Sequence, residues 1–132
     1  SLGAFATMWL FYEKPELAVK KVALLGTPGE ATEFVDEYAR VLKTLPRVKA
    51  NLKSYFAEYA GLDPSYYSTI RFAPSQTSQA LIIHDTGDKE APYAHAVRVN
   101  QLWPNSELIT TNGLGHKLRD ISVVNDVVRF LD

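Results

Sequence analysis

Apolar residues recur at helical spacing at the start of the chain. The stripe, at positions i, i+3, i+4 and i+7, consists of Phe5, Met8, Trp9 and Tyr12. Residues at this spacing share one face of a helix. Pro15 follows the stripe, and proline does not continue a helix because it lacks the backbone N–H. We therefore expect an amphipathic helix over Ala4–Tyr12.

Short apolar runs predict strands further along the chain. The runs are Lys21–Leu25, Ala80–Ile83 and Glu107–Thr110. The last two are each followed by a loop and a helical pattern, over Ala94–Leu102 and Ile121–Leu131 respectively. Strands that alternate with helices favour a parallel sheet with right-handed crossovers. The pattern therefore predicts an α/β fold.

The segment between the first and second predicted strands is too long for a simple crossover. One helical stripe in it consists of Phe34, Val35, Tyr38, Val41, Leu42 and Leu45. A second helix is expected to open at Pro46 and to stop at Gly61, because proline favours the first helical turn and glycine favours the position after the last. Asp63 then precedes Pro64, as in the N-cap of a short third helix.

Composition narrows the possible functions. The chain has 132 residues, 46% of them hydrophobic, which suits one compact domain or part of one. A net charge of −1 disfavours a nucleic-acid binder, which normally carries a basic face. The chain has no cysteine, and this excludes a disulfide scaffold and thiolate metal sites. No apolar run reaches the roughly 18 residues that a membrane span needs.

Residues suited to nucleophilic catalysis occur at three separate places. Ser1 precedes the first helix, an acidic loop (residues 84–92) follows the second strand, and His116 ends a Gly-Leu-Gly-His segment after the third strand. A nucleophilic serine needs a base, and the base needs an orienting acid. His116 suits the base, while Asp85, Asp88 and Glu90 are the candidate acids. A structural histidine beside a glycine-rich turn is the alternative for His116.

The motifs resemble those of the α/β-hydrolase superfamily, and its serine esterases and lipases in particular. The chain order Ser, Asp, His is that of the family's triad. Ser1-Leu2-Gly3 matches the second half of the family's Gly-x-Ser-x-Gly elbow, and His84–Pro92 is similar to its His-Gly-x-x-Asp-x-x-x-Pro pattern. Asp85 replaces the usual glycine. The chain looks like the C-terminal half of such a protein, beginning at the nucleophile elbow.

This resemblance implies a role for each matching residue. Ser1 would be the nucleophile, Asp88 the triad acid and His116 the base. The backbone N–H of Leu2 would donate to the oxyanion. A serine left from an expression tag is the alternative to a native Ser1. His84 and His95 are expected to be structural or surface residues.

The resemblance also implies an organisation for the chain. The predicted strands would be those that the family numbers 6, 7 and 8, so the fold is a partial α/β-hydrolase fold with flanking helices. Residues 1–29 would hold the elbow helix and strand 6, and residues 73–132 would complete the same core. Residues 30–72 would form a small helical cap, in which Tyr66 and Tyr67 contact the substrate. Ordinary peripheral helices are the alternative to a cap.

The expected activity is hydrolysis of a small carboxylic ester or related acyl substrate, with no metal and no organic cofactor. Hydrolysis of a peptide, thioester or carbon–carbon bond on the same fold is one alternative, and a non-catalytic binding module is another. A nucleotide-binding domain is disfavoured, because Gly113-Leu114-Gly115 does not extend to Gly-x-Gly-x-x-Gly.

In the family, further strands precede the nucleophile elbow, and they affect both the activity and the association state that we expect of this chain. They supply further oxyanion-hole and supporting groups, so this chain alone is expected to be inactive. Without them one edge of Lys21–Leu25 would lack a neighbour, and an exposed edge invites pairing with another chain. We therefore expect self-association through this edge. A cytoplasmic location is also expected, although any targeting signal would have to be read ahead of Ser1.

Overall fold

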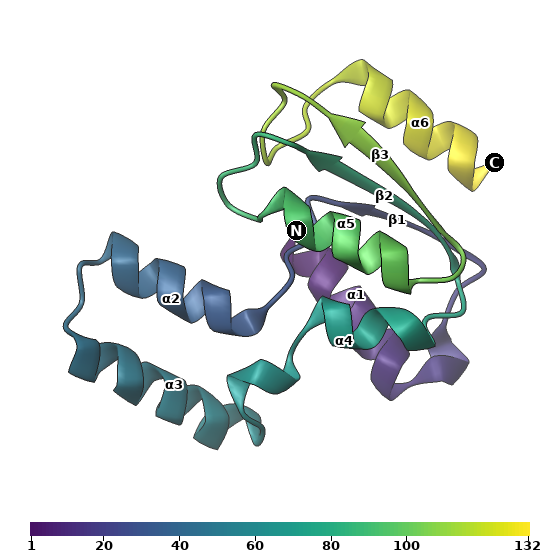
Figure 1. The fold of residues 1–132 in the computed structure, drawn as a ribbon. Helices are drawn as coiled ribbons and strands as arrows, with labels where there is room; N and C mark the ends of the chain where they lie inside the picture. The colour runs from purple at the N-terminus through teal and green to yellow at the C-terminus, as the bar shows by residue number, and fades with distance from the viewer.

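The computed structural model describes residues 1–132, except for the side chain of Tyr38. Its centre is a parallel sheet of three strands in the order β1-β2-β3 (Figure 1). The strands are β1 (Lys21–Leu25), β2 (Gln79–Asp85) and β3 (Ser106–Thr111). Ile82 of β2 lies between Leu24 of β1 and Leu108 of β3. The predicted strands and their parallel arrangement are confirmed.

The described residues form six α-helices. They are α1 (Leu2–Glu13), α2 (Ala31–Val41), α3 (Pro46–Ala60), α4 (Thr69–Phe72), α5 (Tyr93–Leu102) and α6 (Ile121–Leu131). Short 3₁₀ turns lie at Pro15–Leu17, Pro64–Tyr66 and Ala73–Ser75. Helices α1, α4 and α5 cover one face of the sheet, and α6 covers the other (Figure 1). No helix of the described chain is long and apolar enough to cross a membrane.

The larger core lies between the sheet and helices α1, α4 and α5. Met8, Phe72 and Ile82 are fully buried in it. Phe72 packs edge-on to Phe5, with 6.1 Å between ring centroids. Trp103 closes the core after α5, and its indole N–H donates to the carbonyl of Ser78 at 2.9 Å. Aromatic residues thus pack among the aliphatic side chains beneath this face.

The opposite face carries a smaller core. Leu81 and Ile83 of β2 pack there against Val123 of α6 and against Leu118. The helix is confirmed, but its regularly spaced stripe lies in solvent, with Ile121, Val124, Val128 and Leu131 all about half exposed or more. Val123, Val127 and Phe130 of α6 pack against the sheet instead. Helix α6 is thus apolar on two sides.

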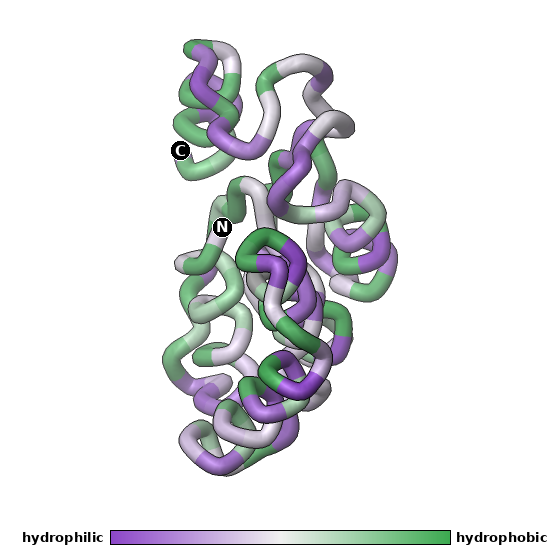
Figure 2. Tube along the Cα trace, turned by 90° about the vertical axis from the view of Figure 1, so that its left-hand side faces the viewer, coloured by the Kyte–Doolittle hydropathy of each residue, from purple (hydrophilic) through white to green (hydrophobic). Residues whose placement is uncertain are grey.

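Helices α2 and α3 form a hairpin that extends away from the sheet (Figure 1). A short antiparallel bridge between Glu30 and Ser68 closes its base. Viewed from the left-hand side of Figure 1, hydrophobic and hydrophilic residues alternate around the helices (Figure 2). On α3, Leu52, Tyr55 and Tyr59 are exposed.

The ends of the hairpin helices follow local sequence signals. Helix α2 ends at Val41, short of the predicted Leu42 and Leu45, and Lys43 turns the chain at φ 51°. The side chain of Tyr38 in the predicted stripe lies outside the described part of the chain. Gly61 ends α3 in the left-handed conformation, as predicted. Asp63 caps the following turn by accepting from the Ser65 N–H at 2.9 Å.

Candidate functional site

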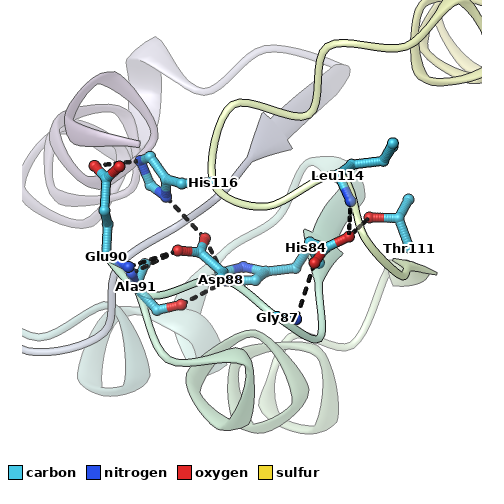
Figure 3. A network of polar contacts seen from close by, with 9 residues as sticks. His84, Gly87, Asp88, Glu90, Ala91, Thr111, Leu114 and His116 are labelled. Carbon is cyan, nitrogen blue, oxygen red and sulfur yellow. Dashed lines mark hydrogen bonds and ion pairs between the residues drawn. The ribbon is translucent and has the colours of Figure 1, made fainter.

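The loops after β2 and β3 meet at the carboxyl edge of the sheet (Figure 3). Since parallel strands all end at the same edge, residues far apart in the sequence come together there. His116 lies with its Nδ1 atom 2.8 Å from Oδ2 of Asp88. The carboxylate side chain is 1% exposed and the imidazole 17% exposed. The structure thus brings two of the predicted site residues into direct contact.

Asp88 is held by several donors. Its Oδ1 accepts from the backbone N–H groups of Glu90 at 2.8 Å and Ala91 at 2.9 Å. Burial raises the pKa of Asp88, but hydrogen bonds from the Ala91 amide, the His116 ring and the Glu90 amide outweigh burial and leave the pKa below its ordinary value. The side chain is therefore a carboxylate at neutral pH. It can accept the Nδ1–H of the imidazole.

A second histidine lies beneath the same carboxylate. His84 is fully buried at the end of β2. Its Nε2 is 2.9 Å from the carbonyl oxygen of Ala91 and 3.2 Å from Oδ2 of Asp88. With a carbonyl as its nearest partner, this nitrogen carries the hydrogen. His84 therefore braces the acidic loop from below, in line with the structural role expected for it.

The chain leaves room for the ring of His116. Gly113 and Gly115 have φ angles of 86° and 62°, which residues with a Cβ rarely adopt. Gly26, directly after β1, has a φ of 57°, and a Cβ there would lie 3.2 Å from Cε1 of His116. These glycines let the loop bend and the imidazole approach the backbone.

With Nδ1–H directed at Asp88, the lone pair of His116 lies on Nε2. Glu90 lies near that nitrogen, with its Oε2 3.8 Å away on a side chain that is 67% exposed. Glu90, a candidate acid in the sequence, therefore lies at the opposite side of the ring from Asp88. An imidazole in this tautomer can accept a proton from a hydroxyl group.

Asp85 has different partners from those a triad acid would have. Its fully buried carboxylate accepts from the Thr111 hydroxyl at 2.8 Å, the Leu114 N–H at 2.9 Å and the Gly87 N–H at 2.9 Å. Burial raises the pKa of Asp85, but the hydrogen bonds outweigh it and lower the pKa to about 2. The sequence did not predict that Asp85 links the two loops. The pairing of Asp85 with Thr111 in the sheet register is what brings the carboxylate to the Thr111 hydroxyl.

Ser1 and Leu2 lie at the start of α1 and are exposed. Among the described residues, no hydrogen bond joins the Ser1 hydroxyl to His116.

Tyr66 and Tyr67 lie in an aromatic cluster beside α1. The Tyr67 hydroxyl donates to the carbonyl of Ala60 at 3.1 Å, and the Tyr66 hydroxyl donates to the carboxylate of Glu13. The two rings pack edge-on, with 5.3 Å between centroids. Among the described residues, neither tyrosine hydroxyl forms a hydrogen bond with His116.

A cavity of about 350 Å³ lies between α2 and the acidic loop. Its lining includes Pro28, Glu33, Phe34, Glu90 and Pro92. Glu90, which lines this cavity, also faces the His116 ring. Among the described residues, no group of three or more His, Cys, Asp or Glu side chains is arranged to hold a metal ion.

The sequence of this chain matches a known protein family. Residues 64–132 match the model of a family described as TAP-like protein. BpoC from Mycobacterium tuberculosis H37Rv is similar in structure, at 19% identity over 97% of this chain and 63% of that chain, with a TM-score of 0.68. No curated protein sequence gives a match.

Two further solved structures share the fold. Est816, an N-acyl homoserine lactone degrading enzyme, matches at 19% identity over 98% of this chain and 64% of that chain, with a TM-score of 0.65. The meta-cleavage product hydrolase CumD from Pseudomonas fluorescens IP01 matches at 17% identity over 97% and 61%, with a TM-score of 0.62. The chain thus spans less than two thirds of these proteins. Identities this low establish the fold alone.

The hydrogen bonds of Asp85 predict a pH-dependent stability. Because its pKa of about 2 lies below the ordinary value of 3.8, the carboxylate contributes fully to stability above the ordinary value and loses that contribution as the pH falls through the lowered one. Asp85→Asn should therefore lower the free energy of unfolding at neutral pH, and its difference from the wild type should shrink between about pH 4 and pH 2. Urea unfolding of both proteins across this range measures the difference. A gap that stays constant with pH would contradict the assignment.

Proposed function

The chain belongs to the TAP-like protein family of α/β-hydrolases, and we propose that it is the C-terminal part of a serine hydrolase of a small carboxylic ester or related acyl substrate. The contact between Asp88 and His116, at 2.8 Å, carries the proposal. A buried carboxylate on Nδ1 fixes the tautomer that a general base requires. The fold alone would not support an activity.

The proposed roles of Asp88 and His116 are supported by their contact, and those of Ser1 and Leu2 by the resemblance to the family's elbow. His116 takes the hydroxyl proton of Ser1 through Nε2 as that oxygen attacks the substrate carbonyl. Asp88 stabilises the imidazolium that forms. The N–H of Leu2 donates to the oxyanion. Protonated His116 then gives its proton to the leaving group, and water releases the acyl group by the same steps in reverse.

This chain by itself is proposed to be inactive. It spans about 63% of the length of its structural relative BpoC, and the family supplies a second oxyanion donor from a segment outside this stretch. Loss of one such donor lowers kcat by about 10²–10³-fold. Activity is therefore a property to test in the full-length protein.

We also propose that residues 30–72 form a cap over the site, between a first core segment of residues 1–29 and a second of residues 73–132. The cavity beside the acidic loop has α2 as one wall, which supports the proposal. Its size is suited to a small substrate. Tyr66 and Tyr67 are proposed to shape the substrate site when the cap closes.

The triad proposal predicts large losses of activity in the full-length protein. Ser1→Ala and His116→Ala should abolish hydrolysis of a p-nitrophenyl ester. Asp88→Asn should lower kcat by about 10⁴-fold, because the amide stabilises the wrong imidazole tautomer. Asp120→Asn serves as the control, because Asp120 caps α6 through Ser122 away from the imidazole. Steady-state kinetics on a panel of esters, thioesters and peptides measures the losses. Full activity of Ser1→Ala would overturn the proposed nucleophile.

The cap proposal predicts changes in substrate preference. Tyr66→Leu and Tyr67→Leu should shift the ratio of kcat/KM between short and long acyl chains, since one packed group is worth about 1–3 kcal/mol of discrimination. Tyr59→Leu is the matched control, because Tyr59 is 84% exposed on α3 and should leave the ratio unchanged. Chain-length profiles that coincide for all four proteins would leave the hairpin as peripheral packing.

The isolated chain is proposed to self-associate through β1. Among the described residues only β2 pairs with this strand, and an unpaired parallel edge invites another strand. Size-exclusion chromatography with light scattering should show a dimer or larger assembly. Val22→Lys on β1 should shift this assembly toward monomer, whereas Lys89→Ser on the acidic loop should not. A stable monomer at micromolar concentrations would contradict the proposal.

A further inference from the structure

A second carboxylate at the sheet edge, that of Asp85, accepts as many hydrogen bonds as that of the proposed catalytic acid. It is fully buried, and the proposed mechanism gives it no task. We propose that Asp85 is a positioning residue that ties the acidic loop to the loop of His116 and so keeps the imidazole on Asp88. The effect of Asp85 on catalysis rests on the proposed function. The hydrogen bonds that link the two loops do not depend on it.

The bonds of Asp85 run to both loops. Its Oδ2 accepts from the Thr111 hydroxyl at the end of β3 and from the N–H of Leu114 in the Gly-Leu-Gly-His segment, at 2.8 and 2.9 Å. Its Oδ1 accepts from the N–H of Gly87 in the acidic loop at 2.9 Å. One side chain thus joins the loop that carries Asp88 to the loop that carries His116.

Leu114 packs at the edge of the smaller core, but the backbone of the His116 loop depends on Asp85 for its side-chain hydrogen bonds. Gly113 and Gly115 on either side of Leu114 have positive φ angles, and glycine is the most flexible residue of the unfolded chain. Within the described structure, the side-chain hydrogen bonds onto residues 112–115 all come from Asp85. His116 is only two residues beyond Leu114, so release of that amide shifts the imidazole directly.

A carboxylate suits this place better than its neutral isosteres. All the groups that face Asp85 are donors, and a carboxylate offers acceptors only. Asparagine would present an NH₂ group to one of these donors. Glycine would leave the Leu114 and Gly87 amides without this acceptor. The lowered pKa of Asp85, about 2, keeps the anchor ionised at any pH at which a serine hydrolase operates.

The test compares Asp85→Asn and Asp85→Gly with Asp120→Asn in the full-length protein. Asp120 is a matched control, because its carboxylate also accepts a backbone N–H, that of Ser122, in the segment after His116. For both Asp85 variants we expect kcat to fall about 10²-fold with KM nearly unchanged, since misplacing a catalytic group by about 1 Å costs this much. The Asp120 variant should keep the wild-type kcat.

Proton NMR provides the readout that does not depend on activity. The Nδ1–H of His116, hydrogen-bonded to Asp88, should give a downfield resonance in the wild type and in Asp120→Asn. This resonance should broaden or vanish in the Asp85 variants. Retention of both the resonance and kcat in a folded Asp85→Asn variant would overturn the proposal.

Two further outcomes are distinguishable. If the full-length wild type hydrolyses no acyl substrate, the proposed function fails, and the NMR comparison alone decides the role of Asp85. If the Asp85 variants do not fold, Thr111→Val replaces them, because it removes only the hydroxyl bond at 2.8 Å. A smaller loss of kcat in the same direction, with a broadened resonance, supports the proposal. An unchanged resonance and kcat overturn it.

Discussion

The structure depends on the pairing of β2 with a parallel strand on each side. All of β2 except its first residue is buried, and its alternating side chains form the centre of both cores. Ile82 contributes to the core under α1 and α5, while Ile83 contributes to the core under α6. The same register fixes where β2 and β3 end. Because both strands end at one edge of the sheet, the acidic loop and the loop of His116 lie side by side there.

Local sequence signals predicted the elements well and their orientation less well. Capping residues and helix-ending glycines act within a few positions, so the ends at Gly61 and Asp63 could be read from the chain. The orientation of α6 could not, because its apolar residues form two stripes, and only tertiary contact selects the one that meets the sheet. Val123 packs inward while Ile121 lies in solvent. Hydrophobic spacing identifies a helix but not its buried side when both sides are apolar.

The residues of the candidate site were predictable from the sequence, but their hydrogen-bond partners were not. Glycines before His116 and acids after β2 are visible in the sequence, and the resemblance to a known motif singled out Asp88. Residue type alone could not separate Asp85 from Asp88, since the two carboxylates are three positions apart. The separation comes from their surroundings. Asp88 faces an imidazole, and Asp85 faces amides and a hydroxyl from a strand that lies 26 residues further along the chain.

The α2–α3 hairpin lies inside the crossover between β1 and β2, and this has a consequence for how the chain assembles. Paired residues Ile82 and Leu108 are 26 positions apart, whereas Leu24 and Ile82 are 58 apart. Doubling a loop costs only about 0.6 kcal/mol of closure entropy. Contacts between near positions form faster than those between distant ones, which favours pairing of β2 with β3 before β1 joins. The Glu30–Ser68 bridge then closes the base of the crossover. Insertions beyond that bridge cost the sheet little, so the α2–α3 hairpin can change in length while the strands stay the same.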